Sequence, residues 1–247
     1  AHIEGKGIVT QDAAGLAQKG GATWSHVLLG SSPDQIHTTR VGMAAADLVI
    51  GCDPIVTAGK ETVLRMREGR TRVALNSHST PTAAFVKDGG WRNPADACTA
   101  EIAKAVGPQA VGAFNADATA TKLMGDSIFT NPMLLGYAWQ KGWVPVGREA
   151  LLRAIELNGV AVEANRAAFE WGRHAAHDPA RVEQLLAPAQ VIEFRKRETL
   201  ETLVARRVEF LTAYQNAAYA RQYAEFVERV GAAEAPLGRT ALAEAVA

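Results

Sequence analysis

Apolar residues in the first half of the chain fall into short continuous runs, which glycine, proline and aspartate separate. Such runs are typical of strands buried in a sheet, and they lie at 7–10, 24–29, 46–53, 71–76 and 109–114. The stretches at 56–66 and 96–106 instead place apolar residues at helical spacing. This alternation predicts an α/β fold, a three-layer α/β/α arrangement around a largely parallel sheet that follows an opening hairpin-like pair.

The second half of the chain has a helical pattern. Pro132 predicts the first position of a helix that Thr130 or Asn131 caps, because proline suits that position and a short polar side chain suits the cap. A second helix is expected over 148–157, where Asn158 and Gly159 supply the usual end signal. These helices belong with the α/β body, which we expect to end near residue 187.

Pro188 and a change in composition mark the predicted boundary, so the expected parts are an α/β domain over 1–187 and a helical extension over 188–247. Residues 192–230 predict one long amphipathic helix in which arginine and glutamate interleave. Interleaved charges are typical of a solvated helix face rather than a nucleic-acid surface. The apolar stripe needs a partner, either the α/β domain or a neighbour beyond residue 247, because 232–247 shows no clear stop signal.

The composition argues against several classes of function. The 247 residues carry 26 basic and 26 acidic side chains, so no net field favours nucleic acid. Two cysteines, Cys52 and Cys98, cannot build a disulfide framework or an iron–sulfur site by themselves, and they fit a reducing, cytoplasmic setting. No apolar run approaches the roughly 20 residues of a membrane helix, so we expect a soluble protein without a membrane partner.

A glycine-rich loop between the first two strands is the first candidate site. It contains Gly15, Gln18, Lys19, Gly20 and Gly21. Its bare amides and its lysine suit a phosphate, a carboxylate or the carbonyl groups of a partner chain. The alternative is a simple turn between strands, and a strand rather than a helix follows the loop, which does not match a phosphate-binding loop.

Polar residues near strands supply further candidates. Ser25 and His26 lie in the strand after the glycine loop, and His26 is either a half-buried strand residue or a hydrogen-bonding group beside that loop. His78 follows the strand 71–76 at the sheet edge where α/β proteins bind ligands, although it could equally anchor the loop. Asp53 either holds a ligand hydroxyl or caps the next helix, and capping is the commoner role. Two protein classes remain, a module of a larger enzyme and a freestanding protein that binds a small molecule.

Several blocks of the sequence resemble a known family. The run 4–7, the glycine loop with Ser25-His26-Val27, and the run 46–53 resemble the gamma-type domain of 2-oxoacid:ferredoxin oxidoreductases. The run 125–138, which contains Asn131, and the run 154–165 are similar to the fused, single-chain indolepyruvate ferredoxin oxidoreductases of bacteria, as is 205–215. The resemblance covers nearly the whole chain, and Asn131 joins the candidate residues through it.

The resemblance implies a parent enzyme that oxidatively decarboxylates aryl 2-oxoacids, joins the acyl group to coenzyme A and passes electrons to ferredoxin. It implies thiamine diphosphate, Mg²⁺ and iron–sulfur clusters in that parent, and partner domains of the same polypeptide that hold them. We expect this chain to be an internal fragment that lacks the first strand of the gamma-type domain. We also expect that the fragment binds none of these cofactors, has no catalytic or metal-ligating residue and is inactive by itself. A homo-oligomeric parent is expected. The glycine loop is then an interface loop towards the thiamine-binding domains.

Overall fold

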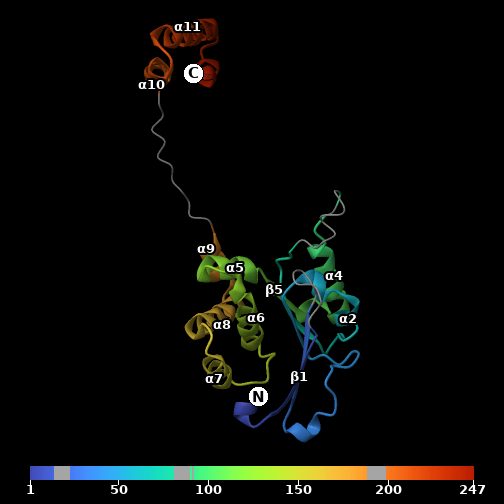
Figure 1. Ribbon diagram of the computed structural model, residues 1–247. Helices are drawn as coiled ribbons and strands as arrows, with labels where there is room; N and C mark the ends of the chain where they lie inside the picture. The colour runs from blue at the N-terminus through green and yellow to red at the C-terminus, as the bar shows by residue number, and fades with distance from the viewer. Residues whose placement is uncertain (14–22, 81–89, 91, 188–198) are drawn as a thin grey trace. The chain divides into compact units, whose positions relative to one another are not determined.

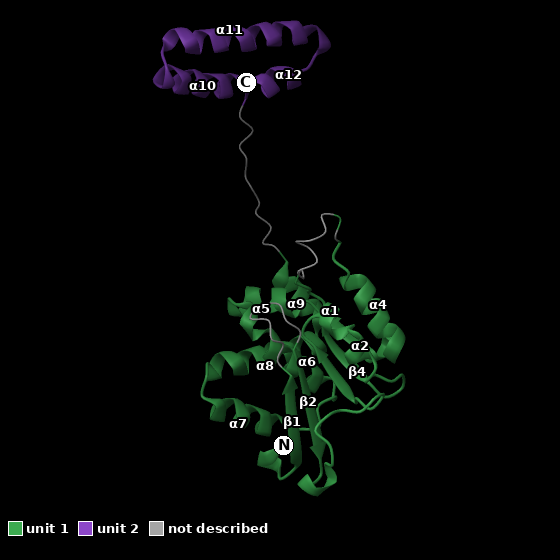
Figure 2. Cartoon of the chain, turned by 45° about the vertical axis from the view of Figure 1, so that its right-hand side comes forward, with its two compact units in different colours: residues 1–188 green, residues 189–247 purple. Residues whose placement is uncertain are grey.

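The computed structural model describes residues 1–13, 23–80, 90, 92–187 and 199–247. The chain forms two compact units, residues 1–188 and 189–247, which are coloured separately in Figure 2. The first unit contains all the strands of the described residues, and the second contains helices. The fold class predicted from the sequence, an α/β body followed by a helical region, is confirmed.

The first unit opens with a short 3₁₀ turn at His2–Glu4 and an antiparallel hairpin. Gly5 ends the turn with φ 69°, a left-handed conformation that glycine adopts without strain. Strand β1 (Gly7–Ala13) pairs with β2 (Trp24–Gly30) from Gly7 opposite Gly30 to Ala13 opposite Trp24. The predicted hairpin-like pair is therefore confirmed.

The parallel sheet has three strands, β3 (Leu48–Gly51), β4 (Arg72–Asn76) and β5 (Val111–Phe114), in the order β3-β4-β5. In the central strand β4, the residues Val73, Ala74 and Leu75 have no exposed surface, as the continuous apolar run predicts. The same prediction is wrong for β3. This strand lies at the edge of the sheet, and its Ile50 keeps 36% of its surface exposed.

Helices cover both faces of the parallel sheet (Figure 1). On one face, Val73 and Leu75 of β4 pack with Ile102 and Val106 of α4 (Ala95–Val106). On the other face, Ala74 packs with residues of three helices, α6 (Thr130–Gln140), α8 (Val162–His177) and α9 (Pro179–Leu186). Because successive strand residues point to opposite faces, three consecutive small or branched apolar residues supply both halves of the core.

The remaining helices of the first unit are short. They are α1 (Pro54–Thr57), α2 (Lys60–Val63), α5 (Ala116–Met124) and α7 (Arg148–Asn158), with 3₁₀ turns at Pro33–Gln35, Pro108–Ala110 and Ser127–Phe129. The expected continuous helix over 56–66 is therefore wrong, since Gly59 separates α1 from α2. Gly159, with φ 70°, ends α7 as predicted.

The predicted cap of α6 is also wrong. The helix starts at Thr130 itself, after Phe129 at the cap position, and neither Thr130 nor Asn131 caps it. Asp126 instead accepts a hydrogen bond from the amide of Ile128 at 2.9 Å and caps the preceding 3₁₀ turn. Because that turn runs straight into α6, the cap acts one turn earlier than the proline signal indicates.

Helices α6 and α8 cross at two glycines. A Cβ added to Gly136 would collide with the carbonyl oxygen of Phe169, and one added to Gly172 would collide with that of Met133. The two backbones therefore touch, and only glycine fits at either position. The crossing carries Tyr137 and Ala138 against the sheet, where Tyr137 stacks on Phe114 with a centroid distance of 4.9 Å.

We predict that Gly136→Ala destabilises the first unit by at least about 3 kcal/mol, because the added methyl group forces the two helices apart. Tryptophan fluorescence during urea denaturation measures this, since all 5 tryptophans precede the second unit in the sequence. Gly42→Ala is the matched control in the same unit, because its Cβ would meet only the Cβ of Ala45 at 3.8 Å. An unchanged fluorescence midpoint for Gly136→Ala would contradict the close crossing.

The second unit consists of α10 (Leu200–Tyr214), α11 (Ala217–Glu234), a 3₁₀ turn at Ala235–Leu237 and α12 (Ala241–Val246). The prediction of one long helix over 192–230 is therefore wrong for the residues that the structure describes, 199–230. Helix α10 ends at Tyr214, and Asn216 starts α11 by accepting a hydrogen bond from the amide of Tyr219 at 2.9 Å. Gly238, with φ 64°, turns the chain between the 3₁₀ turn and α12.

Glu234 connects α11 to α12. Its side chain is only 5% exposed, and its carboxylate accepts hydrogen bonds from the amides of Leu242 and Ala243, both at 2.9 Å. These two N–H groups lower the pKa of Glu234 below its ordinary value of 4.5. Because the folded-state pKa is the lower one, the contribution to stability is present above pH 4.5 and disappears as the pH falls through the folded-state value.

We predict that Glu234→Gln speeds amide exchange in residues 235–247 at neutral pH, and that the difference from the unaltered chain shrinks as the pH falls below 4.5. Mass spectrometry of peptides from this region gives the exchange rates. Glu225→Gln, on the exposed side of α11, is the control and leaves the rates unchanged. A difference that stayed constant with pH would show that the charge of Glu234 does not hold α12.

Candidate functional site

Polar side chains gather where the three parallel strands end. Asn76 is the last residue of β4 and is only 3% exposed. Its Nδ2 donates to the carbonyl of Cys52 after β3 at 3.1 Å, and its Oδ1 accepts from the amide of Ala116 after β5 at 3.0 Å. One amide side chain thus joins the carboxyl ends of all three strands, which is the edge where open α/β sheets bind ligands. We call this place the carboxyl edge.

Asp53 fixes a second part of the carboxyl edge. Its Oδ1 accepts from the amides of Ile55 at 2.8 Å and Val56 at 3.1 Å, so it caps α1. Its Oδ2 accepts from the amide of Thr80 at 3.2 Å. The capping interpretation of Asp53 is confirmed, and the same carboxylate also holds the loop that follows β4.

His78 lies at the carboxyl edge with its side chain 44% exposed. Its backbone amide donates to Oδ1 of Asn76 at 3.2 Å, while its Nε2 stands 4.0 Å from Oδ2 of Asp117. The neighbouring Ser79 is buried and donates to Asn93 at 2.7 Å. The backbone of this loop is thus anchored, and the imidazole of His78 is partly exposed at the carboxyl edge.

Asp117 is a residue of this site that the sequence analysis did not select. The signal was present, because residues 115–117 follow the strand now seen as β5, which ends at the same edge as β4. Asn115 caps α5 through the amide of Ala118 at 2.8 Å, and this cap places Asp117 in the first turn facing His78.

The pKa of both cysteine thiols is raised. Burial and, secondly, the charge of Asp53 raise the pKa of Cys52, and the same two causes raise the pKa of Cys98. A thiol with a raised pKa stays protonated at neutral pH, and the thiolate is the nucleophile.

Ser25 and His26 point to opposite faces of the hairpin, so they do not form one site. Ser25 donates to Asp12 at 2.6 Å on the exposed outer face. His26 lies on the other face, where its Nδ1 accepts from the amide of Val41 at 3.3 Å. Burial is the first cause that lowers the pKa of His26, and the charges of Arg65 and Arg40 lower it further.

The other candidates do not join the carboxyl edge. Gly15, Gln18, Lys19, Gly20 and Gly21 lie outside the described residues. Asn131 is exposed in the first turn of α6, and no hydrogen bond or ion pair among the described residues connects it to His78 or His26.

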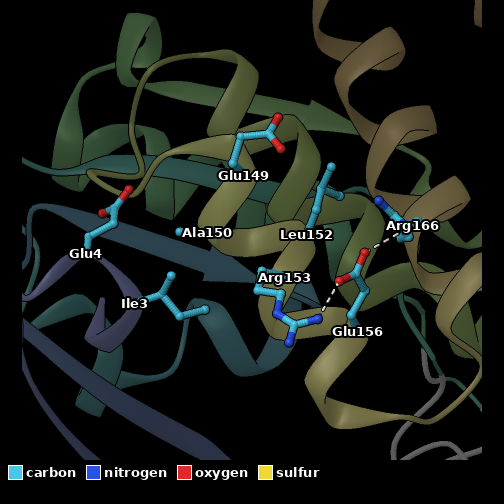
Figure 3. Close-up of a pocket in the computed structure, with 8 residues that line it drawn as sticks. All are labelled: Ile3, Glu4, Glu149, Ala150, Leu152, Arg153, Glu156 and Arg166. Carbon is cyan, nitrogen blue, oxygen red and sulfur yellow. Dashed lines mark hydrogen bonds and ion pairs between the residues drawn. The ribbon is translucent and has the colours of Figure 1, made fainter.

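A hollow of the first unit lies elsewhere among the described residues. It measures about 430 Å³ and is lined by the first 3₁₀ turn, α7 and the start of α8 (Figure 3). Arg153 and Arg166 both turn to Glu156, at 2.9 Å and 3.1 Å. Hydrogen bonding from Arg153, followed by the charge of Arg166, lowers the pKa of Glu156. The other two charged residues that line the hollow, Glu4 and Glu149, pair with Lys6 and Arg148. Each charged group of the hollow therefore already has a partner, which leaves little to recognise a ligand.

A search of the described residues finds no group of three or more histidine, cysteine, aspartate or glutamate side chains that could hold a metal ion. Within the same residues, no helix combines the length and the apolar character that crossing a membrane requires.

Fold and site together define an α/β domain whose sheet presents an anchored polar edge to a ligand or a partner. The family model of pyruvate ferredoxin/flavodoxin oxidoreductase matches residues 1–175, and a second model, of a family of unknown function, matches residues 200–247. The chain therefore belongs to the pyruvate ferredoxin/flavodoxin oxidoreductase family. A comparison with curated proteins found no match.

We predict that Asn76→Ala destabilises the first unit by about 2–4 kcal/mol, because it leaves buried backbone groups of two neighbouring strand ends without their partner. Tryptophan fluorescence in urea measures the loss. Asn165→Ala is the control, since its side chain donates only to the carbonyl of Val160, at 2.9 Å, and the expected cost is about 1 kcal/mol. Equal costs for the two variants would contradict a joining role for Asn76.

Proposed function

We propose that this chain is the gamma-type domain, with its helical extension, of an indolepyruvate ferredoxin oxidoreductase. The parent enzyme would oxidatively decarboxylate aryl 2-oxoacids to acyl-coenzyme A and pass the electrons to ferredoxin. The family match over residues 1–175 carries the proposal. The blocks at 125–138 and 154–165, which are similar to the fused indolepyruvate enzymes, favour this member of the family.

Within the parent enzyme, the chain would act as an interface and scaffold domain. The carboxyl edge supports this role, because the polar side-chain atoms of Asn76 and Asp53 hydrogen-bond to backbone groups and hold the loops in place. His78 is the side chain of this edge that is free to contact a neighbouring domain or a ligand bound there. The glycine loop would contribute Lys19, Gly20 and Gly21 to the same kind of contact, at the wall of the active site or the entrance for coenzyme A.

The cofactors of the parent enzyme would be held by other domains. An iron–sulfur cluster takes four cysteine thiolates, whereas this chain has Cys52 after β3 and Cys98 on α4, both with raised pKa. The residues present therefore do not fit such a cluster. Thiamine diphosphate, Mg²⁺ and the clusters would belong to neighbouring domains of the same polypeptide in a cytoplasmic homo-oligomer, and this chain alone would be inactive.

The second candidate function is a freestanding α/β protein that binds a small molecule. The exposed imidazole of His78, 4.0 Å from Asp117 at a sheet edge, is the observation in its favour. The two candidates differ in what surrounds the chain, because only the first requires thiamine- and cluster-binding domains in the same polypeptide.

We predict that the parent enzyme uses indolepyruvate with a kcat/KM at least about tenfold above that for pyruvate, a difference of about 1.4 kcal/mol in transition-state binding. Anaerobic reduction of methyl viologen in the presence of coenzyme A measures both rates. The isolated chain serves as the control and gives no reduction with either substrate. A preference for pyruvate would refute the indolepyruvate assignment while leaving the family membership intact.

A further inference from the structure

Arginine side chains from two other segments lie near one face of the β1–β2 hairpin. Gln11 and His26 stand directly opposite each other in the hairpin, and Trp24 shares their face because it lies two residues from His26. The indole of Trp24 donates to the hydroxyl of Thr62 at 3.1 Å. This face, which we call the inner face, therefore lies over α2 and the residues that follow it.

Three hydrogen bonds hold the segment 39–41 against Gln11 and His26, and Arg40 makes one of them. Its Nε donates to Oε1 of Gln11 at 3.2 Å, and the hydroxyl of Thr39 donates to the same oxygen at 2.8 Å. The amide of Val41 donates to Nδ1 of His26 at 3.3 Å. Since Nδ1 accepts a hydrogen bond, the neutral imidazole carries its proton on Nε2.

Arg65 belongs to the segment that the inner face contacts through Thr62. It follows Thr62, the partner of Trp24, by three residues, and its side chain is only 22% exposed. Its Nη1 pairs with Glu61 at 3.2 Å, while its Nε is buried and has no hydrogen-bond partner among the described residues. Both Arg65 and Arg40 lower the pKa of His26, after burial, so both positive charges act on the imidazole.

The nearby acidic groups of the described residues already have partners. Glu61 on α2 is paired with Arg65, and Asp12 on β1 is bonded to Ser25 on the opposite face of the hairpin. Like charges that gather at a partly buried place repel one another, and a bound anion would relieve this repulsion.

We propose that His26, Arg40 and Arg65 form a binding site for an oxyanion, the carboxylate or phosphate group of a ligand. Guanidinium groups match the planar or trigonal oxygens of these groups, and the Nε2 proton of His26 adds a directed donor. The proposal concerns residues of this chain alone and does not depend on the proposed function.

The titration of His26, followed by NMR in the full chain and assigned with His26→Gln, tests the site. Sodium sulfate, which stands for a phosphate group, and sodium acetate, which stands for a carboxylate, are compared with sodium chloride at equal ionic strength. We expect at least one of the two to raise the pKa of His26 saturably by about half a unit or more, because a bound anion favours the imidazolium. A response to sulfate alone identifies a phosphate-type site, and a response to acetate a carboxylate-type site.

Two variants complete the experiment. Arg40→Gln should raise the pKa of His26 in chloride, since it removes a positive charge, and should abolish the extra effect of sulfate or acetate. Arg70→Gln is the matched control, because Arg70 pairs with Asp47 at 2.7 Å, and it should leave both responses unchanged. The site is refuted if neither anion acts beyond chloride, or if Arg40→Gln leaves the response to the anions intact.

Discussion

The side chain of Asn76 holds the carboxyl edge of the parallel sheet together. Its amide donates to the carbonyl of Cys52 and accepts from the amides of His78 and Ala116, so it bonds to the segment after each strand. These bonds form at a buried position, where an unpaired polar group would be costly. The position of His78 and the loop that Asp53 holds both depend on this arrangement. The edge is therefore preformed, which suits a surface that receives a partner.

The sequence predicted those parts of the fold whose cause is local. The burial of β4 and the end of α7 at Asn158-Gly159 are both predicted correctly. A continuous apolar run indicates burial, and a glycine indicates a left-handed helix end, so both features leave a local pattern in the sequence. The long helix over 192–230 was predicted wrongly, since helix-favouring residues on both sides hide the break at Gln215 and Asn216. The exposure of Ile50 could not be predicted, because it depends on the order of the strands.

The candidate site was predictable in position but not in composition. His78 was selected because it follows a strand, and its exposed imidazole agrees with that choice. Asp117 needed the pairing of β4 with β5, which only the structure provides. Ser25 and His26 are neighbours in sequence, yet the alternation of a strand puts them on opposite faces. Arg40 lies at the same face as His26 through its hydrogen bond to Gln11, a tertiary contact that leaves no pattern in the sequence.

The proposed function requires that the carboxyl edge faces a neighbouring domain in the parent enzyme. Its most direct test is the rate at which diethyl pyrocarbonate modifies His78, compared between this chain alone and the assembled parent enzyme, with the exposed His177 as an internal reference. The account predicts that His78 reacts readily in the isolated chain, where its side chain is 44% exposed, and is protected in the assembly. Equal rates in the two states, relative to His177, would contradict it.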